Sequence, residues 1–257
     1  MNNNITIAGD GYISEGNYDR IEVMGNATSS GNINTDTLKI NGEARFNGNV
    51  HSKEMKVNGE CKIGGGLEAK NLKVNGDTVI EGDCKVENLV INGDLCVFGT
   101  LKCNNVTIRG DLKVSKNINS INMKVYGDLR AKENIEGEDI NIYGRINCEG
   151  LLTGEDVFIF PKGISKCKEI GATHIEVNKP KNIGFWKAKF SLGYGSMGKL
   201  QCDIIEGDSI KIKNTKANQL NGNSIDLISN CDINTIEYND KLEIGCDCKV
   251  LKHTKIG

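Results

Sequence analysis

A glycine recurs every 17 residues along the first part of this 257-residue chain, and this spacing limits the available folds more than any other feature. Eight copies follow one another without interruption: Gly25, Gly42, Gly59, Gly76, Gly93, Gly110, Gly127 and Gly144. Each is preceded two residues earlier by Val or Ile, and most are followed by Asp or Glu. A strict period of this length is typical of repeat architectures, in which neighbouring repeats complete one another's core.

Within each repeat, numbered from its Val or Ile as position 1, apolar residues recur at positions 1, 5, 7, 11 and 16, and position 13 is small or apolar. This alternation predicts three short, half-buried strands at positions 5–7, 11–13 and 16–1. Glycine at position 3, often again at position 9, and Asn or Asp at position 15 indicate the turns. We interpret the asparagines at position 15 mainly as turn residues, with a side-chain ladder as the alternative.

Three strands of two or three residues per 17-residue repeat cannot form a hairpin sandwich, but they can close one coil of a triangular β-helix. The sequence therefore predicts an all-β solenoid with a regular β-helix over residues 1–160. Pro161 replaces the glycine of position 3, and later copies such as 205–212 and 220–227 are spaced by 15 to 16 residues. We expect residues 161–257 to form an irregular β-solenoid segment with an aromatic insert at about 179–199.

The ends of such a stack are exposed apolar cross-sections with unpaired strand edges. We expect them to be covered or to bind another copy of the chain. The candidate assembly residues are Ile5, Ile7, Ile13 and Ile21 at the start and Leu242, Ile244 and Val250 at the end. The aromatic residues of the insert are candidates for a cap or a partner-binding cluster: Phe185, Trp186, Phe190 and Tyr194.

Composition excludes several classes of function. The formal net charge of −2 argues against nucleic-acid binding by bulk charge. No apolar stretch is long enough to span a membrane, and residues 1–5 do not resemble a signal peptide. The ten cysteines include no CxxC pair, and four of them, Cys61, Cys84, Cys103 and Cys148, fall at positions where other repeats carry Ala, Thr, Val, Leu or Ile. This pattern indicates reduced, buried thiols in a cytoplasmic protein. The three histidines, His51, His174 and His253, lie far apart in the sequence. We therefore expect no metal, no cofactor and no catalytic residue.

The repeat of Val/Ile-x-Gly-Asp/Glu with alternating apolar positions and no helices resembles that of the bactofilins, bacterial polymer-forming cytoskeletal proteins. Residues 1–160 carry the resemblance, and the segments 204–208 and 236–238 are similar to the longer variants of spore-forming Gram-positive bacteria. The resemblance implies a right-handed β-helix that assembles end to end without nucleotide. It also implies a scaffold that supports cell shape or localises other proteins, with itself and cell-envelope or cytoskeletal proteins as partners. Contact with the membrane surface stays open.

Two alternatives remain beside this interpretation. One is an acyltransferase of the hexapeptide-repeat type, but such enzymes have 18-residue coils and small residues where this chain has Leu95, Leu112 and Leu129. The other is a carbohydrate-binding or carbohydrate-active β-helix protein. Such enzymes gather carboxylates on one face, whereas here the acidic residues repeat evenly at the turn after position 3.

Overall fold

The computed structural model describes residues 3–180 and 197–257, and within these ranges the protein consists of strands and turns with no helix. All strand pairs given below are parallel. The all-β solenoid predicted from the sequence is thus confirmed. The strands are β1 (Asn4–Ile7), β2 (Asp10–Ile13), β3 (Gly16–Val23), β4 (Asn26–Ser29), β5 (Ile33–Ile40), β6 (Glu43–Phe46), β7 (Val50–Val57), β8 (Glu60–Ile63), β9 (Leu67–Val74), β10 (Asp77–Ile80), β11 (Cys84–Ile91), β12 (Asp94–Val97), β13 (Leu101–Ile108), β14 (Asp111–Val114), β15 (Ile118–Val125), β16 (Asp128–Ala131), β17 (Ile135–Glu136), β18 (Asp139–Ile142), β19 (Arg145–Ile159), β20 (Ile164–Val177), β21 (Lys199–Lys213), β22 (Thr215–Ser229), β23 (Asp232–Ile244) and β24 (Lys249–Lys255).

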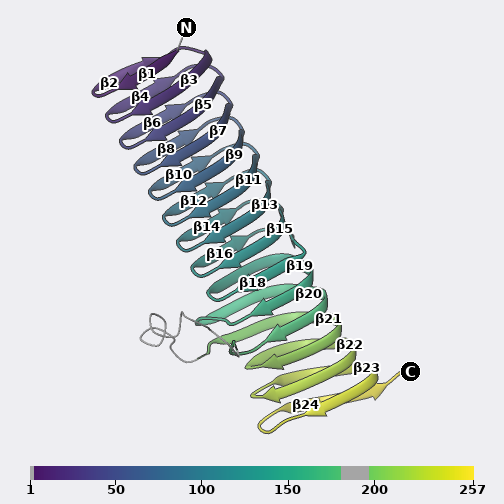
Figure 1. Ribbon diagram of the computed structural model, residues 1–257. Helices are drawn as coiled ribbons and strands as arrows, with labels where there is room; N and C mark the ends of the chain where they lie inside the picture. The colour runs from purple at the N-terminus through teal and green to yellow at the C-terminus, as the bar shows by residue number, and fades with distance from the viewer. Residues whose placement is uncertain (1–2, 181–196) are drawn as a thin grey trace. The chain divides into compact units, whose positions relative to one another are not determined.

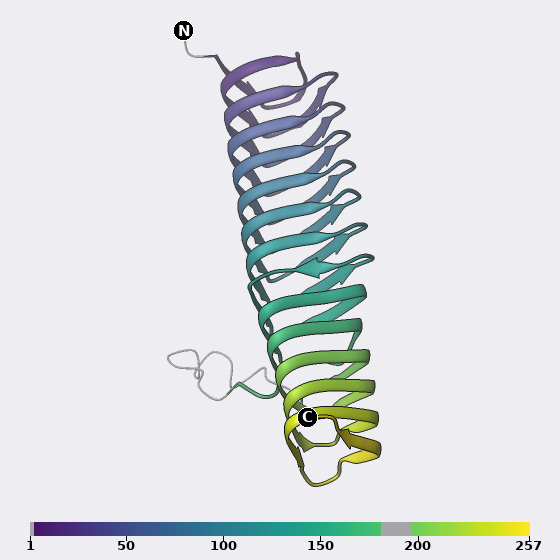
Figure 2. The ribbon, with the colours of Figure 1, turned by 90° about the vertical axis from the view of Figure 1, so that its right-hand side faces the viewer.

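The chain forms two compact units. Unit 1 comprises Met1–Asn122 with Gly127–Glu133, and unit 2 comprises Met123–Tyr126 with Asn134–Gly257. Within each unit successive coils lie one on another, as the ribbon views of Figures 1 and 2 show. The change of repeat length near residue 160 falls inside unit 2, which therefore contains both the last 17-residue repeats and the shorter ones.

Each regular coil of unit 1 contains one four-residue strand and one eight-residue strand, rather than three separate strands. The eight-residue strand joins the predicted arms 11–13 and 16–1. Its pairing passes from Val86↔Ala69 to Asn88↔Asn71 and skips Glu87 at position 14. The corner between the two arms therefore lies inside a continuous strand.

Residues 17 positions apart lie in register on adjacent coils, so like residues form columns through unit 1. The position 7 column, for example, places Ser29 beneath Phe46 and Phe46 beneath Ile63. The predicted inward positions are buried almost throughout, and the alternating burial of β6, β8 and β12 follows the period of two. Because each side chain is covered by its counterparts above and below, the core exists only where coils are stacked.

The glycine of position 3 is required by the close approach of successive turns. A Cβ atom on Gly76 would overlap the carbonyl oxygen of Gly59, and the same holds for each column member from Gly25 to Gly127 against the glycine one coil earlier. Gly9, the first member of the column, has no atom within 4 Å of such a Cβ. The 17-residue glycine period thus records a backbone-to-backbone contact repeated at every coil.

Unit 2 is also built of parallel strand pairs, but its coil length varies. The pairs Ile205↔Leu220, Leu220↔Ile236 and Ile236↔His253 give spacings of 15, 16 and 17 residues. Strands β20 and β21 pair directly from Ile164↔Lys199 to Val177↔Ile212. The predicted insert therefore lies between two strands that are neighbours in the stack, and its residues 181–196 are outside the described part of the chain.

Candidate functional site

Two ladders of asparagine side chains run along the outside of unit 1. The first is at position 15, where each Nδ2 donates to the residue one coil earlier at 2.6–2.9 Å. It begins on the carboxylate of Glu54 and continues through Asn71, Asn88, Asn105 and Asn122. The ladder alternative for position 15 is therefore the arrangement found, because the in-register turns hold successive amides within bonding distance.

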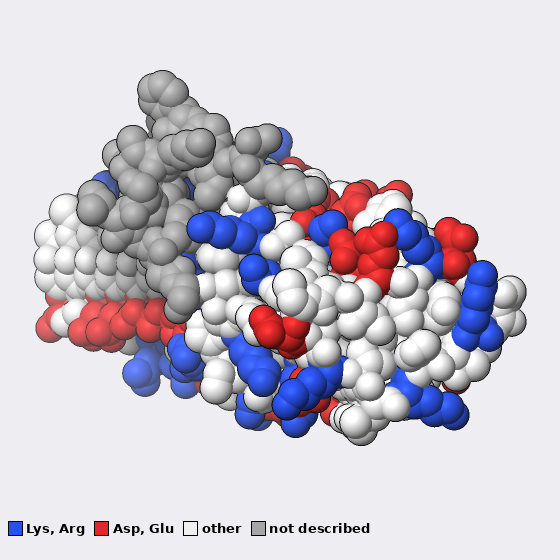
Figure 3. Space-filling model, turned by 90° about the horizontal axis from the view of Figure 1, so that it is seen from below, with Lys and Arg blue, Asp and Glu red and all other residues white. Residues whose placement is uncertain are grey.

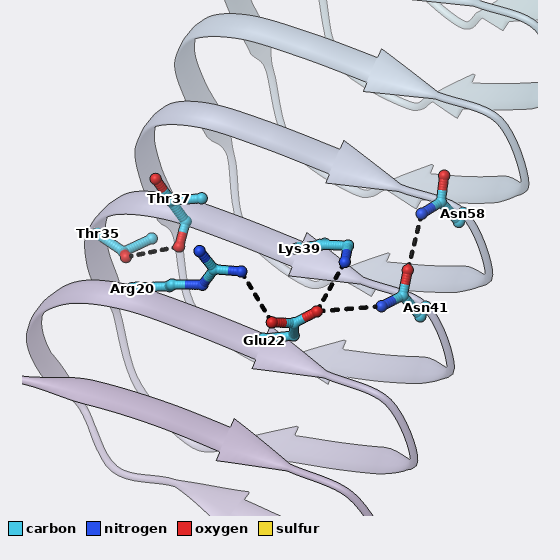
Figure 4. A network of polar contacts seen from close by, with 7 residues as sticks. All are labelled: Arg20, Glu22, Thr35, Thr37, Lys39, Asn41 and Asn58. Carbon is cyan, nitrogen blue, oxygen red and sulfur yellow. Dashed lines mark hydrogen bonds and ion pairs between the residues drawn. The ribbon is translucent and has the colours of Figure 1, made fainter.

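The second ladder, at position 2, was not foreseen. Asn58, Asn75 and Asn92 each donate to the preceding asparagine at 2.7–2.8 Å, and the column starts at Asn41. Figure 4 shows its lower end, where Asn41 donates to Glu22 Oε1 at 3.4 Å. The only sequence signal was the recurrence of Asn immediately before Gly, which also fits an ordinary turn.

Glu22 connects this ladder to two cations. Its carboxylate accepts from Lys39 at 2.7 Å and from Arg20 at 2.9 Å (Figure 4). The hydrogen bond from Lys39, and then that from Arg20, lowers the pKa of Glu22. The cluster joins the second ladder to two charged side chains on the side of the second coil.

The outward charges repeat evenly and do not converge. Six carboxylates share one column at position 4, in register from coil to coil: Glu43, Glu60, Asp77, Asp94, Asp111 and Asp128. Figure 3 shows a regular row of acidic side chains of this kind along one edge of the molecule. Among the described residues, no three His, Cys, Asp or Glu side chains are placed to hold a metal ion. The evenly repeated acidic column does not favour the carbohydrate-active alternative.

The first coil, residues 3–19, closes part of its own apolar end. Its inward positions include two glycines, Gly11 and Gly16. The side chain of Ile7 lies over Gly11, and the ring of Tyr18 lies over Gly16, with the Tyr18 hydroxyl donating to the Ser14 carbonyl at 2.8 Å. Ile7 is 8% exposed, and Ile5 and Tyr18 are half-buried on this face.

The last coil, residues 241–255, is much more open. Ile244 lies on Leu227 and is 45% exposed, while Leu242 and Val250 are half-buried on Ile225 and Ile233. Leu251 and Ile256 add outward apolar surface, 80% and 62% exposed. Beyond β24 no further strand of the described chain pairs with this edge. The coil therefore combines an exposed core cross-section with unpaired backbone groups.

The structure divides the sequence-predicted assembly residues into three groups. Ile13 and Ile21 have no exposed surface because the neighbouring coil covers them, so they belong to the core. Ile5 and Ile7 lie on the first coil, and Leu242, Ile244 and Val250 lie together on the last. The aromatic cluster is outside the described residues: Phe185, Trp186, Phe190 and Tyr194. Tyr18, Leu251 and Ile256 were missed because they fall where the repeat is incomplete.

All ten cysteines are free thiols, and most are buried. Three of them lie directly on one another in unit 2, in the column Cys148, Cys167 and Cys202. Burial raises the pKa of the Cys202 thiol to about 12 and raises that of Cys167 well above its usual value. A thiol that does not ionise near neutral pH is a poor nucleophile and metal ligand, so these cysteines act as small apolar residues.

A parallel β-solenoid with columns of like residues, polar ladders outside and an open terminal coil defines a structural repeat protein. The bactofilin family model, described as polymer-forming cytoskeletal, matches residues 1–102. The match confirms, for this part of the chain, the resemblance noted in the sequence.

Two proteins of Bacillus subtilis (strain 168) are similar to this chain. The uncharacterized protein YhbF is 34% identical over 93 residues, and the uncharacterized protein YhbE is 31% identical over 94. Each alignment covers 36–37% of this chain and 36–38% of the relative, so the matched part spans little more than a third of either protein. No solved structure matches the chain significantly. No helix among the described residues is long and apolar enough to span a membrane.

Proposed function

We propose that this protein is a non-enzymatic scaffold that assembles with copies of itself through the ends of its solenoid. The observation that carries the proposal is the last coil, where Leu242, Ile244 and Val250 leave the core cross-section open beside an unpaired strand edge. Burying that apolar surface and completing the backbone ladder would both favour a second coil of the same cross-section. A copy of this chain presents such a coil.

The family match supports this proposal, because the family containing residues 1–102 is named as polymer-forming and cytoskeletal. Assembly needs no nucleotide in this scheme, since coil stacking alone supplies the contacts. A cytoplasmic scaffold of this kind would support cell shape or position other cytoskeletal or cell-envelope proteins. The alternative is an acyltransferase or a carbohydrate-binding or carbohydrate-active protein, and the evenly repeated acidic column does not favour the carbohydrate-active form.

Sedimentation velocity and negative-stain electron microscopy of the purified chain over a range of concentrations test the proposal. We expect oligomers that grow with concentration in the absence of nucleotide. Ile244→Glu, which places a charge on the open coil, should shift the protein toward monomer. Phe98→Glu is the matched control, because Phe98 is similarly exposed at 48% but lies in the middle of unit 1. A wild-type chain that stays monomeric at every concentration would overturn the proposal.

A further inference from the structure

The outward charge at position 4 of the coils changes sign along the sequence. In unit 1 this position carries the column of carboxylates from Glu43 to Asp128. In strands β19, β20 and β21 of unit 2 it is occupied by Arg145, Ile164 and Lys199. The arm of the coil that is acidic at this position in unit 1 is therefore basic and partly apolar in unit 2.

These residues of unit 2 lie close together because the strands pair in register. Asn147 pairs with Lys166 and Ile164 with Lys199, so Arg145, Ile164 and Lys199 follow one another along the stack. Neighbouring strands are about 5 Å apart, and alternate residues of one strand are about 6.5 Å apart. The three basic residues therefore share one small area of the surface.

The side chains of this area face outward. Burial alternates along the start of β20, so that Ser165 is buried while Ile164 and Lys166 on either side of it are exposed. Lys162 lies in the turn before β20. The exposed residues of this area, which we call the basic patch, are Arg145, Lys162, Ile164, Lys166 and Lys199.

The strands that carry the basic patch hold no carboxylate at positions 4 and 6. Carboxylates return only at the next outward residues of β19 and β21, Glu149 and Asp203. An area with one sign of charge attracts a partner of the opposite sign. The outward residues at positions 4 and 6 of β19, β20 and β21 are Arg145, Asn147, Ile164, Lys166, Lys199 and Gln201.

The basic patch also has an exposed apolar residue at its centre. Ile164 is 58% exposed, with Lys199 beside it on the next strand and Lys166 beside it on its own. A soluble polyanion gains nothing from this side chain, whereas an anionic bilayer offers both phosphates and an apolar layer beneath them. Cations around a projecting isoleucine therefore fit a membrane surface better than a dissolved polymer.

The sequence that leads into the basic patch has the same character. Lys199 N donates to the Gly163 carbonyl at 2.8 Å, so the chain re-enters the described structure beside the patch. Between Glu176 and Asp203 the sequence contains five Lys and the only Trp of the chain, but no Asp or Glu. Lysine together with Trp and Phe is typical of segments that bind the membrane–water interface.

We propose that the basic patch binds the surface of an anionic lipid bilayer. Its ammonium and guanidinium groups pair with lipid phosphates, and Ile164 enters the headgroup layer. The patch lies on a single chain, so this contact is separate from end-to-end assembly. An assembled scaffold would present one such patch per copy and would gain avidity for the membrane.

Co-sedimentation with vesicles tests this inference. The full chain should bind vesicles of equal parts phosphatidylglycerol and phosphatidylcholine, and it should not bind vesicles of phosphatidylcholine alone. Each basic residue near an anionic surface contributes about fivefold in affinity, so Lys166→Glu combined with Lys199→Glu should lower binding at least about 25-fold. The matched control is Lys56→Glu with Lys73→Glu, because these exposed lysines also lie on paired strands but belong to unit 1.

Ile164 distinguishes a lipid surface from a soluble polyanion. Ile164→Ser should lower vesicle binding about fivefold, because it removes apolar surface that the bilayer buries. Ile121→Ser is the control and should bind like wild type, since Ile121 is 42% exposed in unit 1. If polyphosphate bound through the same lysines and Ile164→Ser left vesicle binding unchanged, the contact would be with a soluble polyanion and the membrane inference would be overturned.

Two further measurements complete the test. Circular dichroism of each variant confirms that the coils remain folded, and sedimentation velocity without vesicles should show the same assembly for the patch variants as for wild type. A wild-type chain that ignores anionic vesicles, or an equal loss of binding in the two pairs of lysine variants, would overturn the membrane inference. Either result would leave the proposed end-to-end assembly standing.

Discussion

The side-chain amide of Asn88 donates a 2.9 Å hydrogen bond to Oδ1 of Asn71, the residue that pairs with it one coil earlier. Asn105 repeats this relation toward Asn88 at 2.9 Å. An amide has both a donor and an acceptor, so a column of asparagines satisfies itself at every rung except the ends. The turn residue of the repeat therefore also forms a hydrogen bond between successive coils.

Removing one rung from this ladder should weaken unit 1 measurably. Asn88→Ala loses the bond to Asn71 and the bond from Asn105, and we expect the free energy of unfolding to fall by about 1 kcal/mol, given the exposure of both bonds. Chemical denaturation followed by circular dichroism measures this. Lys70→Ala changes an exposed residue next to the ladder and should leave the denaturation midpoint unchanged. If the two variants lost equal stability, the asparagine hydrogen bonds would not stabilise the stack of coils.

The glycine column predicts a contrast between two identical substitutions. Gly76→Ala forces a methyl group onto the Gly59 carbonyl, and we expect a loss of at least about 1–3 kcal/mol, because the overlap is with backbone. Gly9→Ala has open space around the new Cβ and should unfold like wild type. Thermal melts of the two variants decide the matter, and similar melting temperatures would show that close approach is not the reason for the glycine period.

A buried hydroxyl in the core offers a stabilising change. The Oγ1 of Thr78 is buried without a hydrogen-bond partner, in a column between Cys61 and Leu95. Thr78→Val replaces it with a methyl group of the same shape and should raise the free energy of unfolding by about 1 kcal/mol. The matched control is Thr35→Val, because the Thr35 hydroxyl donates to the Thr37 carbonyl at 3.1 Å (Figure 4). We expect Thr35→Val to give no gain.

The repeat made the core of the coils predictable, because a period of 17 places each inward residue in register with the inward residues of the neighbouring coils. Leu95, for instance, lies in register between Thr78 and Leu112, as its position 5 requires. The hydrogen bonds between the outward asparagines were harder to predict. Asn before Gly suits a turn whether or not its side-chain amide bonds to another coil.

The end coils were less predictable for a different reason. The burial of an inward residue there depends on which side chain folds over it, and this is not periodic. Ile13 belongs to the first coil yet has no exposed surface, while Ile244 holds an equally regular position in the last coil and is 45% exposed. Tyr18 adds local cover to the first coil, where its ring lies over Gly16 and its hydroxyl donates to the Ser14 carbonyl.

The buried thiols predict a decline of stability at alkaline pH. Burial raises the pKa of Cys103 and Cys202 to about 12, whereas a thiol in the unfolded chain ionises near 8.5. Below about pH 8.5 both states keep the proton, and these thiols make no pH-dependent contribution. Above it only the unfolded state releases the proton, so the free energy of unfolding falls as pH rises, by about 1.4 kcal/mol per pH unit for each buried thiol.

Denaturant unfolding at pH 7.5, 9 and 10 in the presence of a reductant measures this slope. Cys61→Ala provides the comparison, because Ala44 occupies the same column one coil earlier and burial raises the pKa of Cys61 too. The variant loses some packing at every pH, but its stability should decline less steeply between pH 9 and pH 10 than that of wild type. Parallel slopes for the two proteins would show that Cys61 ionises no less readily in the folded coil than in the unfolded chain.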